Sequence, residues 1–282
     1  MKSFTDKVVV ITGAGSGIGR ALAQNFAARG AKLALSDVDE AGLADTVRLL
    51  GSVSARSDRL DVRDRTAMAA YAASVAEEFG AVNVVINNAG VALTGSVLDM
   101  TYADLEWIVD IDFWGVVNGT KEFLPYLIDS GDGHLVNLSS LFGLLAVPGQ
   151  SAYNAAKFAV RGFTEALRQE MLVAGHPVAV SCVHPGGIKT AIARNARVAG
   201  AEDQAALADY FDRKLAKTSP AKAAEIIVAG MLAGKPKIVV GADAKVLDLL
   251  VKVLGARYQN VLARVSKKQV PQPKAISNRS AV

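Results

Sequence analysis

Short apolar runs alternate with longer amphipathic stretches along most of the chain. The apolar runs are rich in Val, Ile and Leu, which is typical of strands buried on both faces of a parallel sheet. The predicted strands are 7–11, 32–37, 53–60, 82–86, 134–139, 177–183 and 237–240. Helical periodicity fills the intervals, and the predicted helices are 20–30, 39–50, 64–79, 101–130, 151–174 and 220–233.

This alternation predicts an α/β fold, a Rossmann-type doubly wound parallel sheet in a single domain with helices on both faces. Residues 1–242 form this domain, and its third strand, 53–60, is unusually polar. Ligands bind at the carboxyl ends of the strands in such sheets. Residues 191–218 are rich in Ala and charge and carry no strand signal, so we interpret them as a mobile helical lid.

The remaining residues, 243–282, read as an amphipathic helix followed by a basic tail. One apolar stripe is predicted on that helix, formed by Val246, Leu250, Val253, Leu254, Tyr258, Val261, Leu262 and Val265. We expect the stripe to pack against the domain or a sister subunit, with contact to a membrane surface as the alternative. The last segment, 269–282, reads as disordered.

Composition narrows the class of protein. Of the 282 residues 51% are hydrophobic, which is enough for a large core. The single cysteine, Cys182, lies in an apolar run, so we expect it in the core and no intramolecular disulfide. No signal peptide is recognisable and no apolar run approaches the ~20 residues of a membrane span, which predicts a cytoplasmic protein. The histidines lack the spacing of a metal site; they are His134, His176 and His184.

The formal charge of +4 arises at the C-terminal end of the chain. From residue 261 onward there are basic residues and no acidic one; the basic residues are Arg264, Lys267, Lys268, Lys274 and Arg279. Aromatic residues are not interleaved with them as in nucleic-acid readers, and such tails are usually solvated. We therefore expect no nucleic-acid partner.

A glycine-rich turn, TGAGSGIG at 12–19, joins the first strand to the first helix. This order places backbone N–H groups and the positive end of a helix against a phosphate, and the glycines allow a pyrophosphate to approach closely. The alternative is a turn without a ligand. The predicted cofactor contacts in the turn are Gly13, Ser16, Gly17, Ile18 and Gly19.

Asp37 ends the second strand, where a carboxylate accepts hydrogen bonds from the adenosine ribose hydroxyls and repels a 2′-phosphate. Neither Ser16 nor Val38 supplies a cation for that phosphate. The sequence therefore predicts NAD(H) over NADP(H), with a solvated strand-end aspartate as the alternative. Asp61 and Val62, after the third strand, are predicted to form the lip of the adenine pocket.

Tyr153 and Lys157 stand four residues apart in helix 151–174 and so share one face. An ammonium group beside a phenol favours the phenolate and lowers the tyrosine pKa from about 10, which suits acid–base chemistry. Ser140, at the end of strand 134–139, is placed to offer a hydroxyl to the oxygen that Tyr153 protonates. A pair with this spacing is more often a solvated helix face, so the interpretation depends on the other motifs.

Those motifs are specific in combination. They are TGAGSGIG at 12–19, NNAG at 87–90, a serine thirteen residues before the tyrosine, YNAAK at 153–157 and PGGIKT at 185–190. With them the chain resembles the short-chain dehydrogenase/reductase family, in its single-domain type, over about residues 5–242.

The resemblance implies roles for individual residues. Tyr153 would be the general acid/base, Ser140 would hydrogen-bond the substrate oxygen, and Lys157 would hold the nicotinamide ribose while lowering the pKa of Tyr153. Further cofactor contacts implied by the motifs are Asn87, Ala89, Gly90, Pro185, Gly186, Ile188 and Thr190. The resemblance also implies a homotetramer or dimer, with helices 101–130 and 151–174 at the interface.

One position departs from the family pattern. The family usually has an asparagine in an N-x-x-G pattern, and alignment on Gly115 puts Asp112 there. An ionised carboxylate accepts a hydrogen bond but cannot donate one. We hypothesise that Asp112 stabilises the ammonium of Lys157 and takes part in the proton relay, with an altered pH profile.

These observations predict an NAD(H)-dependent oxidoreductase that interconverts a hydrophobic secondary alcohol and its ketone. No Lys or Arg is clearly placed to clamp a carboxylate or phosphate on the substrate. The expected pocket is apolar, formed by Leu141, Phe142, Leu144, Leu145, Val147 and Ala191. The alternatives are an NADPH-dependent carbonyl reductase and a non-catalytic dinucleotide-sensing protein.

Overall fold

The computed structural model describes residues 1–200 and 203–269, in which the main sheet has seven parallel strands. Its strand order, β3-β2-β1-β4-β6-β7-β9, places the first strand next to the fourth. The strands are β1 (Val8–Thr12), β2 (Lys32–Asp37), β3 (Ala55–Arg59), β4 (Val84–Asn87), β6 (Gly133–Leu138), β7 (Val178–Pro185) and β9 (Lys237–Val240). The predicted doubly wound sheet is confirmed.

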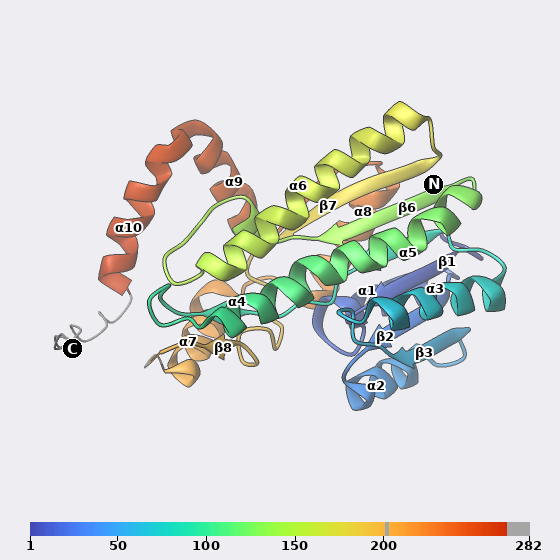
Figure 1. Cartoon of the computed structure of the whole chain (residues 1–282), viewed down its shortest axis with the longest axis horizontal. Helices are drawn as coiled ribbons and strands as arrows, with labels where there is room; N and C mark the ends of the chain where they lie inside the picture. Colours follow the sequence, from blue (N-terminus) through green and yellow to red (C-terminus); the bar gives the residue numbers. More distant parts are fainter. Residues whose placement is uncertain (201–202, 270–282) are drawn as a thin grey trace.

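Helices cover both faces of this sheet (Figure 1). Alternate residues of β1 point to opposite layers, so Val9 and Ile11 belong to one apolar cluster and Val8 and Val10 to the other. The first layer contains α1 (Gly17–Ala27), α2 (Glu40–Leu50) and α8 (Pro220–Leu232). The second contains α3 (Arg65–Phe79), α5 (Gly115–Asp129) and α6 (Ser151–Ala174).

The polarity of β3 follows from its position at the edge of the sheet. Arg56 in this strand forms ion pairs with Asp58, at 2.7 Å, and with Glu78 of α3, at 3.0 Å. Charged side chains on an edge strand discourage pairing with another chain. Strand β3 therefore has a physical reason to lack the apolar pattern of the central strands.

The stretch predicted as one helix over 101–130 is helical throughout but changes its winding in the middle. Helix α4 (Tyr102–Val109) passes into a π-helical turn, η1 (Asp110–Trp114), which continues as α5. A π turn adds a residue to the helical repeat and redirects the side chains it carries. Asp112 lies in this turn, which apolar periodicity did not predict.

The segment predicted as a helical lid, 191–218, is only partly helical. It contains α7 (Gln204–Tyr210) and a π turn, η3 (Phe211–Leu215), but also a short strand, β8 (Arg197–Val198), paired with β5 (Leu93–Thr94). The helical interpretation is therefore only partly right, and β8 was missed because a two-residue strand is too short to leave a periodic pattern. The guanidinium of Arg197 also lies 3.7 Å from the ring centroid of Trp107 in α4.

The C-terminal stretch forms two helices, α9 (Ala242–Leu254) and α10 (Tyr258–Gln269), that extend from the domain as an arm (Figure 1). Gly255 separates them, with a φ of +53° that favours glycine. The single apolar stripe is therefore divided. Leu254, Tyr258 and Leu262 pack against the domain, whereas Val246 and Val253 are exposed.

Three further expectations concern individual features of the chain. Cys182 is buried as predicted, and burial raises the pKa of its thiol to about 12. Within residues 1–200 and 203–269, none of the helices has the length and apolar character that crossing a membrane requires. The expectation of disorder concerns a segment that, from residue 270 onward, lies outside the described residues.

Candidate functional site

The site is built where β1 and β4 end side by side. The hydroxyl of Thr12 accepts hydrogen bonds from the backbone N–H groups of Asn88 (3.0 Å) and Ala89 (3.1 Å). The side-chain amide of Asn88 donates to the carbonyls of Thr12 (2.9 Å) and Gly13 (3.0 Å). These contacts lock the glycine turn to the loop at 87–90. Sequence reasoning assigned no role to Thr12 or Asn88, although both lie inside the motifs.

The glycines of the turn lie where other segments approach closely. A Cβ atom on Gly13 would come within 2.7 Å of the Cα of Ala89, and one on Gly17 would lie 3.0 Å from Cγ2 of Thr190. Both glycines have positive φ. Ser16 precedes α1, and the first turn of that helix carries no acidic residue. No acidic side chain of the helix itself competes for the amides at its start, which suits a phosphate.

Asp37 faces the same turn. Its Oδ2 accepts a hydrogen bond from the N–H of Gly15 at 2.8 Å, and its Oδ1 accepts from Asp39 at 3.0 Å. The nearby guanidinium of Arg20 donates to the carbonyls of Gly15 and Gly42. The Asp37 carboxylate is therefore fixed beside the turn, while the Arg20 guanidinium is hydrogen-bonded to backbone carbonyls.

Asp61 and Val62 lie on the loop after β3. Asp61 binds the guanidinium of Arg63, with Oδ2 at 2.6 Å from Nη2, and the hydrogen bonds from Arg63 lower the pKa of Asp61. The carbonyl of Val62 accepts a hydrogen bond from Asn118 of α5 at 2.9 Å. The loop is thereby held against α5 at the predicted edge of the site.

The loop at 87–90 divides its side chains between the interior and the site. The amide of Asn87 points inward and donates to Oδ1 of Asn137 in β6 at 2.8 Å, so its side chain is part of the packing beneath the site. Gly90 lies against Asp112 and Lys157. A Cβ atom on Gly90 would be 3.2 Å from Oδ1 of Asp112 and 3.3 Å from Nζ of Lys157.

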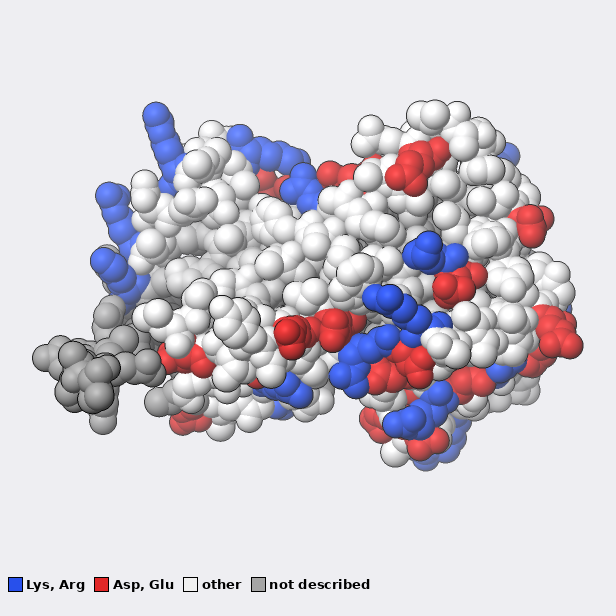
Figure 2. Space-filling view, in the orientation of Figure 1, with Lys and Arg blue, Asp and Glu red and all other residues white. Residues whose placement is uncertain are grey.

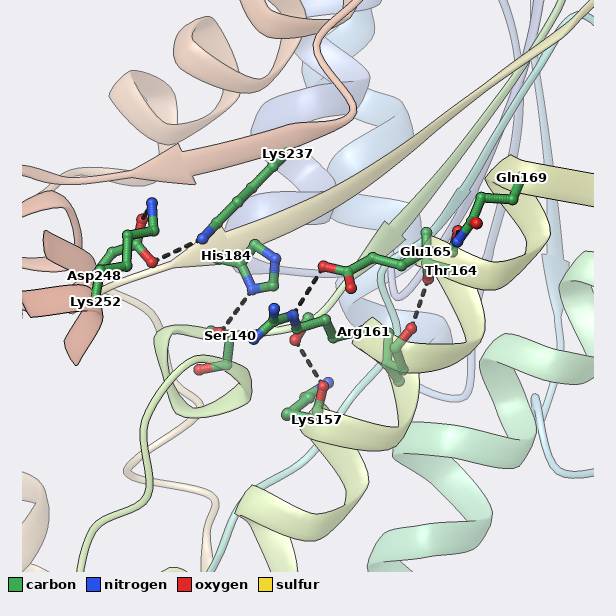
Figure 3. Close-up of polar contacts among 12 residues, drawn as sticks. Ser140, Lys157, Arg161, Thr164, Glu165, Gln169, His184, Lys237, Asp248 and Lys252 are labelled. Carbon is green, nitrogen blue, oxygen red and sulfur yellow. Dashed lines mark hydrogen bonds and ion pairs between the residues drawn. The ribbon is translucent and has the colours of Figure 1, made fainter. Parts of the chain in front are cut away.

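Ser140 follows β6 and begins a short 3₁₀ turn, η2 (Leu141–Gly143), where its hydroxyl accepts from the N–H of Phe142 at 3.1 Å. Its carbonyl oxygen lies 3.0 Å from Nδ1 of His184, as Figure 3 shows. Burial lowers the pKa of His184 to about 4, so the ring is neutral and its Nδ1 carries the proton donated to Ser140. Sequence reasoning assigned no role to this histidine.

Tyr153 is buried beside Lys157, as their spacing predicts. The ammonium nitrogen of Lys157 lies 5.7 Å from the centroid of the phenol ring. Burial raises the pKa of Tyr153, and the opposing effects of Lys157 and of the hydrogen-bonding Ser140 hydroxyl offset it only in part. The predicted lowering by Lys157 is present, but the prediction of a net lowering is wrong because desolvation of the phenolate is the larger effect.

Asp112 and Lys157 form a buried ion pair, with Oδ2 and Nζ 3.2 Å apart. The other carboxylate oxygen accepts the N–H of Val91 at 2.8 Å, and Nζ also donates to the carbonyl of Leu138 at 3.3 Å. Burial lowers the pKa of Lys157, but Asp112 and Tyr153 outweigh it and the pKa lies above its usual value. Burial also raises the pKa of Asp112 against the pull of Lys157. Lys157 therefore remains an ammonium group at neutral pH.

Two loops complete the site. In the loop after Ser140, Leu141 and Leu145 pack against the C-terminal helices. Both side chains were expected to line the substrate pocket, but they face the core. Of the other residues expected in that pocket, Leu144 is buried, whereas Phe142, Val147 and Ala191 are half-buried.

The loop after β7 is fixed by α9 and by the sheet. Gly186 donates its N–H to the carbonyl of Val240 at 2.9 Å, and Gly187 donates to Oδ2 of Asp243 at 2.8 Å. Ile188 is buried in the core, and Thr190 reaches Gly17 as described above. Pro185 forms the buried end of β7. The loop thus lies beside the glycine turn, as the motifs require.

Known proteins share this architecture. The family model described as short chain dehydrogenase matches residues 7–200. The chain is 62% identical to SadH of Mycobacterium tuberculosis, a protein named as an oxidoreductase, over 97% of this chain and 100% of SadH. A short-chain dehydrogenase/reductase from Burkholderia phymatum, solved in complex with NAD, is 31% identical with a TM-score of 0.85, covering 92% of this chain and 98% of that one. A levodione reductase is 30% identical with a TM-score of 0.76, and the match covers 86% of this chain and 98% of the reductase.

The buried ion pair predicts a large stability effect when one partner is removed. Asp112→Leu leaves the Lys157 ammonium buried without its counter-ion, and we expect a loss of about 3–5 kcal/mol in the free energy of unfolding. The double variant Asp112→Leu/Lys157→Met removes both charges and should recover most of that loss. Urea denaturation of the single and double variants measures the difference.

The matched control is Glu225→Leu, which breaks an exposed ion pair with Lys222 in α8 and should cost less than about 1 kcal/mol. A double variant no more stable than Asp112→Leu would show that lost packing, and not the unpaired ammonium, causes the effect.

Proposed function

The chain belongs to the short-chain dehydrogenase family, and within it we propose an NAD(H)-dependent oxidoreductase that interconverts a hydrophobic secondary alcohol and its ketone. The observation that carries the proposal is the convergence of Ser140, Tyr153 and Lys157, with the Lys157 ammonium beside the loop at 87–90. Lys157 lies near both the Tyr153 ring and Gly90 of the cofactor motif, so one ammonium group adjoins the acid–base residue and the cofactor loop.

The residues fit a dinucleotide and supply the proton chemistry. The amides at the start of α1 suit the pyrophosphate, and the Asp37 carboxylate suits the adenosine ribose. The nicotinamide, when bound, accepts or donates the hydride. During oxidation the Tyr153 phenolate takes the proton of the alcohol, and during reduction the phenol returns it to the carbonyl oxygen. Ser140 donates a hydrogen bond to the same oxygen, and the Lys157 ammonium stabilises the phenolate.

Asp37 supports NAD(H) as the cofactor. Its carboxylate is held next to the glycine turn by Gly15, where a 2′-phosphate on the ribose would meet a negative charge. Arg20 is engaged by the carbonyls of Gly15 and Gly42 and so does not neutralise such a phosphate. The Burkholderia phymatum relative, solved with NAD, supports the same choice. NADP(H) is the less favoured alternative.

The substrate class follows from the predicted pocket side chains that remain partly accessible. Phe142, Val147 and Ala191 are half-buried and apolar. The Phe142 ring packs edge-on against the Tyr153 ring, with centroids 6.0 Å apart. An apolar alcohol or ketone is therefore the best match. The similarity to a levodione reductase is consistent with a carbonyl substrate. A dinucleotide sensor without catalysis would have no need of an ammonium group beside the buried phenol.

The first test compares NAD⁺ and NADP⁺ reduction at 340 nm on a panel of hydrophobic secondary alcohols at pH 7 and 9. We expect turnover that prefers NAD⁺ and falls by at least about 100-fold in Tyr153→Phe, because that variant has lost its proton acceptor. The variant should still bind NADH, measured by fluorescence titration. NADH binding without turnover on any alcohol or ketone would favour the sensor alternative, and preferred use of NADP⁺ would contradict the role given to Asp37.

A second prediction concerns the pH dependence. The Asp112 carboxylate raises the pKa of Tyr153, so Asp112→Asn removes that effect and the pKa of Tyr153 falls. Oxidation needs the phenolate, and its rate rises with pH as Tyr153 loses its proton. We therefore expect the rising limb of kcat/KM for alcohol oxidation to move to lower pH in Asp112→Asn.

The matched control for this prediction is Asp110→Asn, which makes the same change in the same π turn at an exposed position. A rising limb at the same pH in Asp112→Asn and in the unaltered enzyme would refute the role of Asp112 in the relay.

We also propose that the chain forms a homotetramer or dimer through α5 and α6. Uncharged residues cover most of the face that these helices present in Figure 2. Large apolar side chains of these elements are exposed, including Phe158 of α6 and Trp114 of the adjoining π turn, at 39% and 40%. Replacing both with Lys should yield monomers in light scattering. An unaltered chain that is itself monomeric would contradict the proposal.

A further inference from the structure

The loop from 141 to 149 joins Ser140 to the helix that carries Tyr153, so its conformation sets what approaches the catalytic hydroxyls. Side chains hold its backbone. The amide of Asn154 donates to the carbonyls of Phe142 (2.7 Å) and Leu145 (2.9 Å) and accepts from the N–H of Val147 (3.2 Å). The N–H of Ala146, between them, needs another acceptor.

Tyr258 of α10 supplies that acceptor. Its hydroxyl accepts the hydrogen bond from Ala146 at 3.0 Å, across 112 positions of sequence. The Tyr258 side chain is only 8% exposed and packs in one apolar cluster with Leu141 and Leu145 of the loop. The C-terminal arm thus contacts the loop through both a hydrogen bond and a buried ring.

The arm is itself fixed to the sheet. Lys237 of β9 forms an ion pair with Asp248 of α9 at 2.7 Å, and Lys252 approaches the same carboxylate at 2.9 Å (Figure 3). Asp243, near the start of α9, accepts the N–H of Gly187 at 2.8 Å. Because α9 is anchored at the strand end and at the loop after β7, the position of Tyr258 is defined relative to the catalytic residues.

Phe142 connects this packing to the catalytic tyrosine. It lies against the cluster that contains Tyr258 and also against the cluster that contains Tyr153. Its ring meets the ring of Tyr153 edge-on. A shift of the loop at Ala146 would therefore move an aromatic side chain that touches the acid–base residue.

We propose that Tyr258 of α10 is a positioning residue for the substrate site, which holds the loop at 141–149 in the conformation that admits a bulky apolar alcohol or ketone. The inference rests on the proposed function. It assigns the arm a role in substrate preference, through the loop at 141–149.

The test uses Tyr258→Phe, which keeps the ring and removes only the acceptor for Ala146. The matched control is Tyr102→Phe, the same change at a side chain that is 84% exposed. Hydrogen–deuterium exchange of the full chain should show faster exchange in peptides covering 141–149 for Tyr258→Phe alone. KM for the bulkiest alcohol turned over should rise about three- to tenfold, the worth of one hydrogen bond, with kcat less affected and NADH affinity unchanged.

Faster exchange together with the rise in KM supports the proposal. Exchange and KM equal to those of Tyr102→Phe would overturn it, as would a loss of NADH affinity equal to the rise in KM, which would indicate a general disturbance of the site. Hydrogen exchange needs no turnover, so the two proposals can fail separately. An unaltered chain that turns over no alcohol would refute the proposed function. Exchange at 141–149 that is unchanged in Tyr258→Phe would refute the role of Tyr258 in holding the loop.

Discussion

Parallel pairing of the strands is the constraint on which the site depends. Because all seven described strands of the main sheet run in one direction, every strand ends at the same edge, and the chain must return through a crossover before each new strand. The order of the strands reverses between β1 and β4. The crossovers leave in opposite directions at that point and open the crevice. The hydroxyl of Thr12, at the end of β1, accepts hydrogen bonds from the loop after β4 and so fixes the base of the crevice.

A buried ion pair is costly unless its remaining hydrogen-bonding groups are satisfied. Asp112 and Lys157 meet much of this requirement through the Val91 amide and the Leu138 carbonyl. The π turn is what brings a residue of the α4–α5 stretch into this position, because the extra residue in its winding redirects the side chain of Asp112. With a carboxylate at position 112, Lys157 is held by charge, and the same charge opposes ionisation of Tyr153.

Much of the fold could be predicted from the sequence because the signals are local. Apolar runs such as 7–11 and the glycine turn that follows depend on neighbouring residues only. The polar strand 53–60 was predicted correctly and is explained by its place at the sheet edge. The π turn at Asp112 and the strand at Arg197–Val198 were missed, because each is too short to alter the period of the pattern.

In the candidate site, too, the features with a local sequence signal were predicted and the others were not. Tyr153 and Lys157 were predicted to meet because helical spacing fixes their separation. The net pKa of Tyr153 was not predictable, since it depends on how much solvent the folded chain removes from the phenol. The loop contacts of His184 and Tyr258 had no local signature either, although Tyr258 was predicted on the apolar stripe. Each side chain bonds a loop backbone distant in sequence, at Ser140 and Ala146. The motifs therefore define the dinucleotide half of the crevice. The loop at 141–149, which we propose lies on the substrate side, is instead held by Asn154 of α6 and by Tyr258 of α10, beyond the last strand. A change in the C-terminal arm could thus alter the substrate side while leaving the glycine turn and Asp37 in place.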